Sequence, residues 1–210
     1  MPTRRGQPAT VIDDRILAAA ERLFGEHGFE IPLARIARAA RVSDAVMRRR
    51  VGSKAKLVER VIERLFRGRW KTEWDALLVE RSIPLGDRLS RFYVEYRGNI
   101  TRTGARLWNR TGLMGLHISR DFSTTLETRI LKPIVRELRR EAGISRADER
   151  PVTEREIELV QVVHAAIAFP HTRTHLYGMR VYGTLEELVP MMVRVWLPGA
   201  LAEIKRLNPR

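Results

Sequence analysis

The stretch from Ile36 to Leu57 constrains the fold more than any other part of this chain. It contains or overlaps two short runs that we expect to be helical, Leu33–Ala40 and Asp44–Arg50. The gap between them, residues 41–43, has the length of the turn in a helix-turn-helix motif. Ser43 is suited to cap the second run, because its hydroxyl can accept a hydrogen bond from an amide of the first helical turn.

The two runs have an apolar side and an arginine side. Apolar residues recur at three- and four-residue spacing, namely Leu33, Ile36, Ala37, Ala40, Val42, Val46 and Met47. The other side carries Arg35, Arg38, Arg48, Arg49 and Arg50. A helix of about seven residues is not stable alone, so the second run must dock on a neighbour. A short docked helix with outward arginines is suited to insertion into a DNA groove.

With these features the sequence resembles the tetracycline-repressor (TetR) family of bacterial transcription regulators. An ordered set of residues carries the resemblance: Ile16-Leu17-Ala18-Ala19-Ala20, Leu23-Phe24, Gly28-Phe29, Ile36-Ala37, Ala40, Val42-Ser43, Ser53-Lys54 and Leu57. Beyond them only the helical layout and the length agree. The resemblance implies operator DNA as a partner, an effector pocket in the C-terminal domain and a homodimer formed by the last two long helices. The alternative is an unrelated small helical domain.

The sequence departs from the family pattern at the turn and in the second run. Arg41 stands where the family usually has glycine, and a left-handed backbone there would cost arginine about 1–2 kcal/mol more than glycine. Residues 45–48 replace the usual Gly-Thr-Leu-Tyr, and Arg50 and Val51 replace a Tyr or His and a Phe. Pro32 stands where a capping Thr is common, and proline is tolerated at a helix start. These departures concern base readout rather than the fold.

The charge is strongly basic and unevenly distributed. The net charge is +14; residues 1–70 hold 16 Lys and Arg against 8 Asp and Glu, whereas residues 71–210 hold 23 against 17. A basic N-terminal module favours binding to phosphate groups. An alternative interpretation attributes the arginine surplus to GC-rich coding.

Several classes of function and location are disfavoured. The chain has no cysteine, which excludes disulfides and thiolate metal sites. No apolar run is long enough to span a membrane, and no apolar segment follows the first arginines as in a signal peptide, so a cytoplasmic protein is expected. No nucleophile–base arrangement or glycine-rich phosphate loop is present, so we expect neither an enzyme nor a cofactor.

The periodicity predicts an all-α chain with an N-terminal helix-turn-helix domain and a C-terminal ligand-binding and dimerisation domain. The expected divisions are a basic arm at 1–9, the DNA-binding domain at 10–56, a connecting helix at 57–80 and a regulatory domain at 81–210. Outside the motif, helices are expected at 10–27, 54–79, 84–102, 105–117, 123–142, 154–178, 185–197 and 199–207. Pro170 should kink the helix that contains it.

The candidate DNA-binding residues lie in the arm, the two short helices and the start of the next. They are Arg4, Arg5, Arg35, Ser43, Asp44, Ala45, Arg48, Arg49, Arg50 and Lys54. Lys54 lies beside the positive end of a helix capped by Ser53, which is suited to clamp a phosphate.

Aromatic and polar residues of the later helices form the candidate effector pocket. They are Phe92, Tyr96, Arg106, Trp108, Arg110, Met114, His117, His164, Phe169 and Arg173. Core packing is the alternative for each aromatic residue. The polar anchor is expected to be His164, Arg106 or Arg110, and the effector an anionic or hydrogen-bonding molecule with an aromatic or aliphatic body. Together with His171 and His175, His164 forms a weaker candidate metal set, which Pro170 interrupts.

The apolar positions of the last helices form the candidate dimer interface, by implication of the family resemblance. They are Ile157, Val160, Val163, Ile167, Leu188, Met192, Val195 and Trp196. The expected helix 54–79 begins beside the DNA and ends near the pocket, so we expect it to act as a lever between them.

The main hypothesis is therefore a dimeric repressor that a small effector releases from a palindromic operator. The rival hypotheses are a basic protein that binds DNA of any sequence and a metal-responsive regulator.

Overall fold

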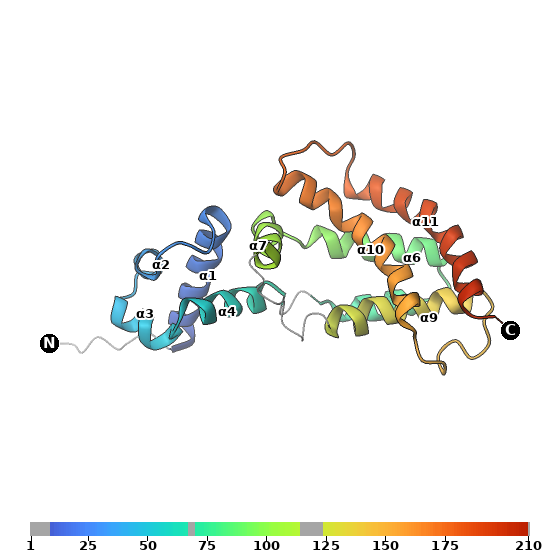
Figure 1. Ribbon diagram of the computed structural model, residues 1–210, viewed down its shortest axis with the longest axis horizontal. Coiled ribbons are helices and arrows are strands. Elements are labelled where there is room, and N and C mark those ends of the chain that lie inside the picture. The colour runs from blue at the N-terminus through green and yellow to red at the C-terminus, as the bar shows by residue number, and fades with distance from the viewer. Residues whose placement is uncertain (1–8, 67–69, 114–123, 210) are drawn as a thin grey trace. The chain divides into compact units, whose positions relative to one another are not determined.

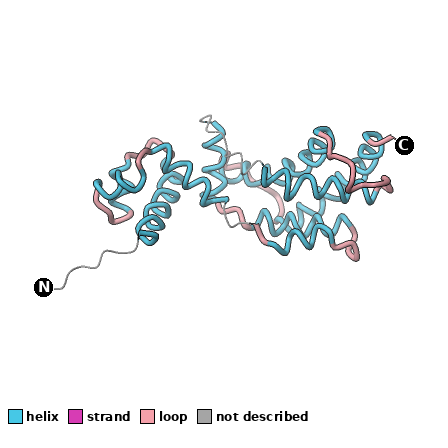
Figure 2. The backbone as a smooth tube through the Cα atoms, turned by 90° about the horizontal axis from the view of Figure 1, so that it is seen from below, coloured by secondary structure: helices cyan, strands magenta, loops and turns pink. Residues whose placement is uncertain are grey.

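The computed structural model describes residues 9–66, 70–113 and 124–209, and these form helices and loops without a strand (Figure 2). The chain divides into two compact units. The described part of the first unit is residues 9–66 and 102–113, and that of the second unit is residues 70–101 and 124–209. The expected all-helical fold is confirmed. The candidate residues Arg4, Arg5, Met114 and His117 lie outside the described residues.

The first unit contains the predicted helix-turn-helix and the helices that support it (Figure 1). Its helices are α1 (Ala9–His27), α2 (Leu33–Ala39), α3 (Asp44–Val51), α4 (Lys54–Phe66) and α7 (Arg102–Leu113). α1 packs against α2, α4 and α7. Its buried core includes Ile16, Phe24, Ile36, Met47, Leu57, Val61 and Leu107. The apolar stripe read from the sequence therefore faces this core.

α7 belongs to the first unit, although its residues fall within the regulatory domain expected from the sequence. Its contact with α1 depends on a glycine. A Cβ atom at Gly25 would lie 2.6 Å from the Cγ2 atom of Thr103, closer than non-bonded carbon atoms approach. Gly25 therefore allows α7 to pack closely on α1.

The second unit is a bundle whose two longest helices are the last in the chain (Figure 1). It contains α5 (Thr72–Val79), α6 (Leu85–Gly98), the π-helix η1 (Glu127–Leu131), α9 (Lys132–Glu141), α10 (Glu154–His175) and α11 (Leu185–Leu207). α11 packs against α6, α9 and α10. The core they share includes Trp74, Leu89, Phe92, Tyr93, Ile134, Leu138, Val160, Val163, Ile167, Val193 and Ile204.

The continuous helix expected at 54–79 is not present. α4 ends at Phe66 and α5 begins at Thr72. Between them Lys71 has an extended backbone, with φ −98° and ψ 129°, so α5 starts as a new helix. The single helix expected to act as the lever is therefore two separate helices, α4 and α5.

The helices containing prolines also differ from expectation. The run expected at 123–142 includes η1, which ends immediately before α9 and its Pro133. A proline ring collides with the carbonyl four residues earlier in a regular α-helix, and the wider π turn relieves this collision.

α11 continues through Pro198, where the sequence predicted a break between two helices. It continues because Ala200 and Ile204, beyond the proline, are buried in the core.

Candidate nucleic-acid interface

The turn between α2 and α3 has the left-handed backbone that is unfavourable for arginine at position 41. Arg41 has φ 54°, in the left-handed region that glycine occupies more readily. Arg15 of α1 reaches this turn and donates through Nη2 to the carbonyl oxygens of Ala40 and Arg41, the latter at 3.0 Å. The guanidinium thus satisfies carbonyls at the end of α2 and offsets part of the strain at Arg41.

α3 begins as predicted, with Ser43 as its N-cap. The Ser43 hydroxyl accepts a hydrogen bond from the Val46 amide at 3.3 Å. Met47 and Val51 are buried and attach the helix to the core of the first unit. α3 also contacts α2 and α4, so this eight-residue helix is positioned by its neighbours rather than by its own stability.

α3 and its N-cap expose five of the ten predicted DNA-binding residues. The side chains of Ser43, Asp44, Ala45, Arg48 and Arg49 are exposed. Met47 and Val51 of the same helix are buried, so α3 is docked through these two side chains and leaves the exposed ones free. This is the arrangement that a helix needs to enter a DNA groove while remaining attached to its domain.

Arg50 is placed differently from Arg48 and Arg49. Its Nη1 atom lies 3.8 Å from Oδ1 of Asp13 on α1. Arg60 of α4 lies 3.5 Å from Oδ2 of the same carboxylate and donates to the Arg50 carbonyl oxygen at 3.2 Å. Asp13 and Arg60 therefore connect the C-terminal end of α3 to α1 and α4, and Arg50 is half-buried in this group. The sequence pattern did not identify Asp13, Arg15 or Arg60, since they lie on other helices.

Two further candidates lie at helix starts in the first unit. Arg35 on α2 is exposed, with its Nη2 atom 3.4 Å from Nε2 of His27. Ser53 accepts a hydrogen bond from the Lys56 amide at 3.2 Å, which confirms it as the cap of α4. Lys54 is half-buried at the first position of that helix, where the positive helix end favours an anion.

The candidate effector residues are distributed over both units. Arg106, Trp108 and Arg110 lie on α7 of the first unit. There Arg110 donates to the carbonyl oxygens of Phe24 and Gly25 and so caps the end of α1. Arg110 therefore supports the end of α1 in the first unit, and its expected role as polar anchor stays a prediction. Phe92, Tyr96, His164, Phe169 and Arg173 belong to the second unit.

The second-unit candidates have different surroundings. Phe92 is fully buried and stacks on Tyr96, with ring centroids 5.5 Å apart. His164 lies against the rings of Tyr93 and Tyr96. Phe169 is exposed, and Arg173 donates to the Arg180 carbonyl oxygen at 2.9 Å. Of this set, the structure brings together only the buried Phe92 and the half-buried Tyr96 and His164.

The histidines expected as a weak metal set are not grouped as three. His171 and His175 pack edge to face, with ring centroids 5.6 Å apart. Within the described ranges, no three His, Asp or Glu side chains are arranged to hold a metal ion.

The candidate dimer residues divide between the core and the surface. Val160, Val163 and Ile167 are buried in the second unit itself, with exposed fractions of 0–1%. They cannot offer apolar area to another chain while that core is intact. Ile157, Leu188, Met192 and Trp196 are half-buried, and the Trp196 indole donates to the Leu159 carbonyl oxygen at 3.2 Å. Val195 is 78% exposed and remains the most accessible of the set.

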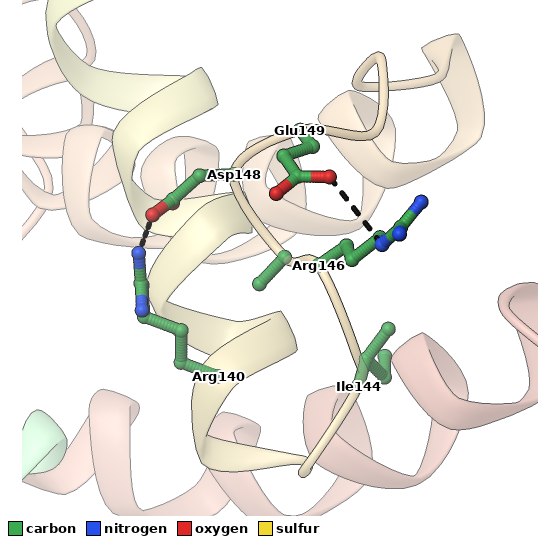
Figure 3. Close-up of a pocket in the computed structure, with 6 residues that line it drawn as sticks. Arg140, Ile144, Arg146, Asp148 and Glu149 are labelled. Carbon is green, nitrogen blue, oxygen red and sulfur yellow. Dashed lines mark ion pairs between the residues drawn. The ribbon is translucent and has the colours of Figure 1, made fainter.

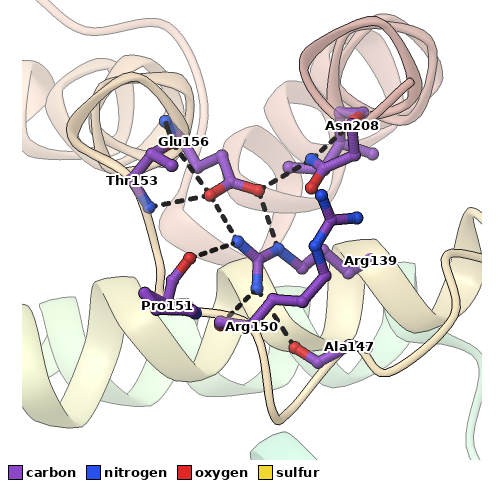
Figure 4. A network of polar contacts seen from close by, with 8 residues as sticks. Arg139, Ala147, Arg150, Pro151, Thr153, Glu156 and Asn208 are labelled. Atoms are coloured by element: carbon purple, nitrogen blue, oxygen red, sulfur yellow. Dashed lines mark hydrogen bonds and ion pairs between the residues drawn. The ribbon is translucent and has the colours of Figure 1, made fainter. Parts of the chain in front are cut away.

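A buried polar network that the sequence did not reveal fixes one end of the second unit (Figure 4). Arg139 binds both carboxylate oxygens of Glu156 and three backbone carbonyls, of Ala147, Arg150 and Pro151. Asn208, at the end of α11, donates to Glu156 at 2.8 Å. The sequence spacing of Thr153 and Glu156 is that of a capping box, and this was the available signal.

The loop after α9 forms a shallow hollow of about 420 Å³ whose charged groups pair with one another (Figure 3). Arg140 pairs with Asp148, and Arg146 lies 3.5 Å from Glu149. Since its cations and anions are matched, this hollow is not a strong candidate for a charged ligand.

Comparison with known proteins supports the assignment of the first unit. Residues 16–61 match the family model described as bacterial regulatory proteins, tetR family. This match spans α2, the turn and α3, and it agrees with the resemblance that the sequence shows in this part of the chain. No curated protein matches the chain. No described helix is long and apolar enough to cross a membrane.

Two solved structures have a similar fold. One is a protein from Mesorhizobium loti MAFF303099 that is assigned to the TetR family of transcriptional regulators, with 12% identity, a TM-score of 0.59 and coverage of 94% of this chain and 98% of that chain. The other is a mutant of the HlyIIR protein in which one segment is replaced by a linker containing two thrombin sites. It has 18% identity, a TM-score of 0.59 and coverage of 88% of this chain and 98% of that chain. At these identities the likeness concerns the fold.

Proposed function

We propose that this TetR-family regulator binds a near-palindromic DNA operator as a homodimer and represses transcription until a small effector releases it. The observation that carries the proposal is the two-sided construction of α3. One side is anchored by Met47 and Val51, and the other presents Arg48 and Arg49 to solvent.

The exposed side of α3 is suited to contacts with the phosphate backbone and with the base edges of DNA. Arginine contacts phosphates through its charge and can bind guanine with two parallel hydrogen bonds. Ser43 and Asp44 stand at the start of the helix, where side chains reach base edges in helix-turn-helix proteins. Lys54 at the start of α4 supplies an additional cation for the DNA backbone.

The supports of α3 favour a fixed docking geometry. Arg15 holds the turn before the helix, and Asp13 and Arg60 hold its end. A helix held at both ends presents its side chains with little loss of conformational entropy on binding. This arrangement favours readout of sequence over indifferent binding to any duplex.

Homodimer formation is supported by apolar stripes on α10 and α11, which pack side by side. Val162 and Phe169 are 60% and 53% exposed on α10, and Met191 and Val195 are 42% and 78% exposed on α11. Their spacing of seven and four residues places each pair on one side of its helix. Burial of these residues against a second copy removes apolar area from water. We therefore place the centre of the interface on these residues and on Leu188, rather than on Val160 or Val163.

A dimer also determines the form of the operator. Two recognition helices related by a two-fold axis require two half-sites of opposite orientation, separated by about one helical turn of DNA, roughly 34–36 Å. An effector bound to the second unit can act only by favouring a state in which this spacing no longer fits. Repression follows if the operator overlaps a promoter.

The experiment is selection of bound sequences from a random duplex library, using the full chain without added ligand. The proposal expects enrichment of an inverted repeat with a constant spacing between half-sites. Enrichment of no sequence, with equal affinity for all duplexes, would instead identify a DNA-binding protein without sequence preference. A repeat that appears only when a metal salt is added would favour the metal-responsive hypothesis.

A further inference from the structure

Three polar side chains meet between α6 and α10 of the second unit, where Tyr93 and Arg97 are buried and His164 is half-buried. Tyr93 is fully buried, and its ring centroid lies 5.8 Å from that of His164. Arg97, one helical turn after Tyr93 on α6, is 8% exposed and donates to the Ala168 carbonyl oxygen of α10 at 3.2 Å. The rings of Phe92 and Tyr96 lie beside this group.

Tyr93 and His164 each have a polar atom that is buried and lacks a hydrogen-bond partner among the described residues. Within the described chain, neither the Tyr93 hydroxyl nor Nδ1 of His164 has a hydrogen-bond partner. A buried polar group that lacks a partner lowers stability by about 1–3 kcal/mol, and proteins rarely retain such groups without a use. Two of them side by side indicate that a further molecule completes the cluster.

The charge state of the cluster indicates what that molecule is. Burial, together with the charge of Arg97, lowers the pKa of His164 to about 4, so this histidine is neutral at pH 7. Burial raises the pKa of Tyr93 well above its usual range, so its hydroxyl keeps its proton. At neutral pH the cluster therefore combines a neutral imidazole, a hydroxyl donor and one guanidinium cation, which together favour an anion.

A separate hollow lies further along α10. His171, seven residues after His164 and on the same side of the helix, lines a hollow of about 420 Å³. Pro170, Met179, Val181 and Leu188 contribute apolar surface to it. Burial, followed by the charge of Arg97, lowers the pKa of His171 to about 4, so this charge acts on both the cluster and a residue of the hollow.

We propose that Tyr93, Arg97 and His164 bind the acid group of a small organic carboxylate with an aromatic or aliphatic body. This inference rests on the proposed function, in which a small molecule regulates DNA binding, and it names the chemical class of that molecule. The carboxylate accepts a hydrogen bond from the Tyr93 hydroxyl and is paired electrostatically with Arg97. Of the three anchors expected from the sequence, the cluster contains His164, whereas Arg106 and Arg110 lie in the first unit.

The test measures binding of matched acids and amides to the full chain in the absence of DNA. Benzoate is compared with benzamide, and hexanoate with hexanamide, by thermal shift and calorimetry. In each pair the body is the same and only the charged acid group is lost. We expect at least one carboxylate to bind about tenfold or more tightly than its amide, the range for a hydrogen bond to a charged group.

Tyr93→Phe is the decisive variant, because it removes one oxygen atom and keeps the ring in the core. Without ligand its melting temperature should equal or exceed that of the wild type, since the hydroxyl it loses is unsatisfied. Its affinity for the carboxylate should fall about tenfold or more. Tyr182→Phe, at a 73% exposed position, is the control and should bind like the wild type.

Three results would overturn the inference. They are carboxylates that bind no more tightly than their amides, a Tyr93→Phe protein that is less stable without ligand, and unchanged carboxylate affinity in that variant. The second result would mean that water already satisfies the hydroxyl in the resting protein. None of these measurements involves DNA, so their failure leaves operator binding untouched, and a failure to select an operator leaves the carboxylate site untouched.

Discussion

Arg15 of α1 donates to the carbonyl oxygen of Arg41 at 3.0 Å, so the first helix holds a turn residue whose φ is 54°. The two residues are 26 positions apart, and the contact joins the core of the first unit to the start of the recognition helix. The backbone strain at Arg41 and the hydrogen bond from Arg15 thus occur at the same turn. Substitutions can separate their contributions to stability.

Arg41→Gly should raise the free energy of unfolding by up to about 1 kcal/mol, because glycine relieves the left-handed strain at some entropic cost. Arg15→Ala should lower it by about 1–2 kcal/mol, because carbonyls at the end of α2 lose a charged donor. Urea unfolding monitored by circular dichroism measures both changes. A destabilised Arg41→Gly protein would show that the Arg41 side chain has a contact that outweighs the strain.

Arg48 and Arg50 should differ in their effect on DNA binding. Arg48→Ala should reduce operator affinity and lower the slope of log affinity against log salt by about one, as expected for a lost phosphate or base contact. Arg50→Ala should change this slope less, because Arg50 is half-buried beside Asp13. Fluorescence anisotropy at several salt concentrations measures the slopes. Equal slopes for the two variants would contradict the distinction.

The helix-turn-helix could be predicted from the sequence because its signals are local. Ser43 caps α3 from the adjacent position, and the stripe of Ile36, Ala40 and Met47 follows directly from helical spacing. The roles of Arg50 and Arg110 could not be predicted in this way. Arg110 binds a carbonyl 86 positions earlier in the chain, and only the folded structure brings such partners together.

The same limit applies to the last two helices. Both sides of α10 carry apolar residues, so periodicity alone did not separate the buried Val163 from the exposed Val162. The break expected at Pro198 reflects local propensity, which the buried residues after it override. Helix type was therefore predictable, whereas the assignment of each face to core or interface depended on tertiary packing.

Removal of one partner from the buried Arg139–Glu156 pair should be strongly destabilising. Glu156→Gln leaves a buried guanidinium without its counter-charge, and about 3–5 kcal/mol of stability should be lost. Glu203→Gln, at an exposed ion pair of α11, is the matched control and should leave the stability nearly unchanged, because solvent screens the pair. Chemical denaturation of both variants provides the comparison, and equal losses would contradict a structural role for the network.

The same carboxylate should make stability depend on pH. Burial alone would raise the pKa of Glu156, but hydrogen bonds from Arg139, Asn208 and Thr153 outweigh it and lower the pKa to about 2. The folded state therefore binds this proton less readily than the unfolded state, whose carboxyl titrates near 4.5. The stabilisation is complete above that value and is lost as pH falls towards 2. Acid unfolding of Glu156→Gln should lack this component of the wild-type profile.

Charged substitutions on α10 and α11 should separate the interface from the core. Val195→Glu should give a folded monomer, because Val195 is 78% exposed in the single chain. Val163→Glu should prevent folding, because Val163 is 1% exposed within the second unit. Light scattering and circular dichroism together distinguish these results. A Val195→Glu protein that remains dimeric at micromolar concentration would place the interface elsewhere.

The central claim is sequence-specific binding of a dimer to paired half-sites. The most direct measurement is competition between the selected inverted repeat and a random duplex of equal length, at one fixed salt concentration. We expect the repeat to bind about 10³-fold or more tightly than the random duplex, the lower limit for specific DNA-binding proteins, and to bind one dimer. Equal affinities, with the same salt dependence for both duplexes, would contradict it.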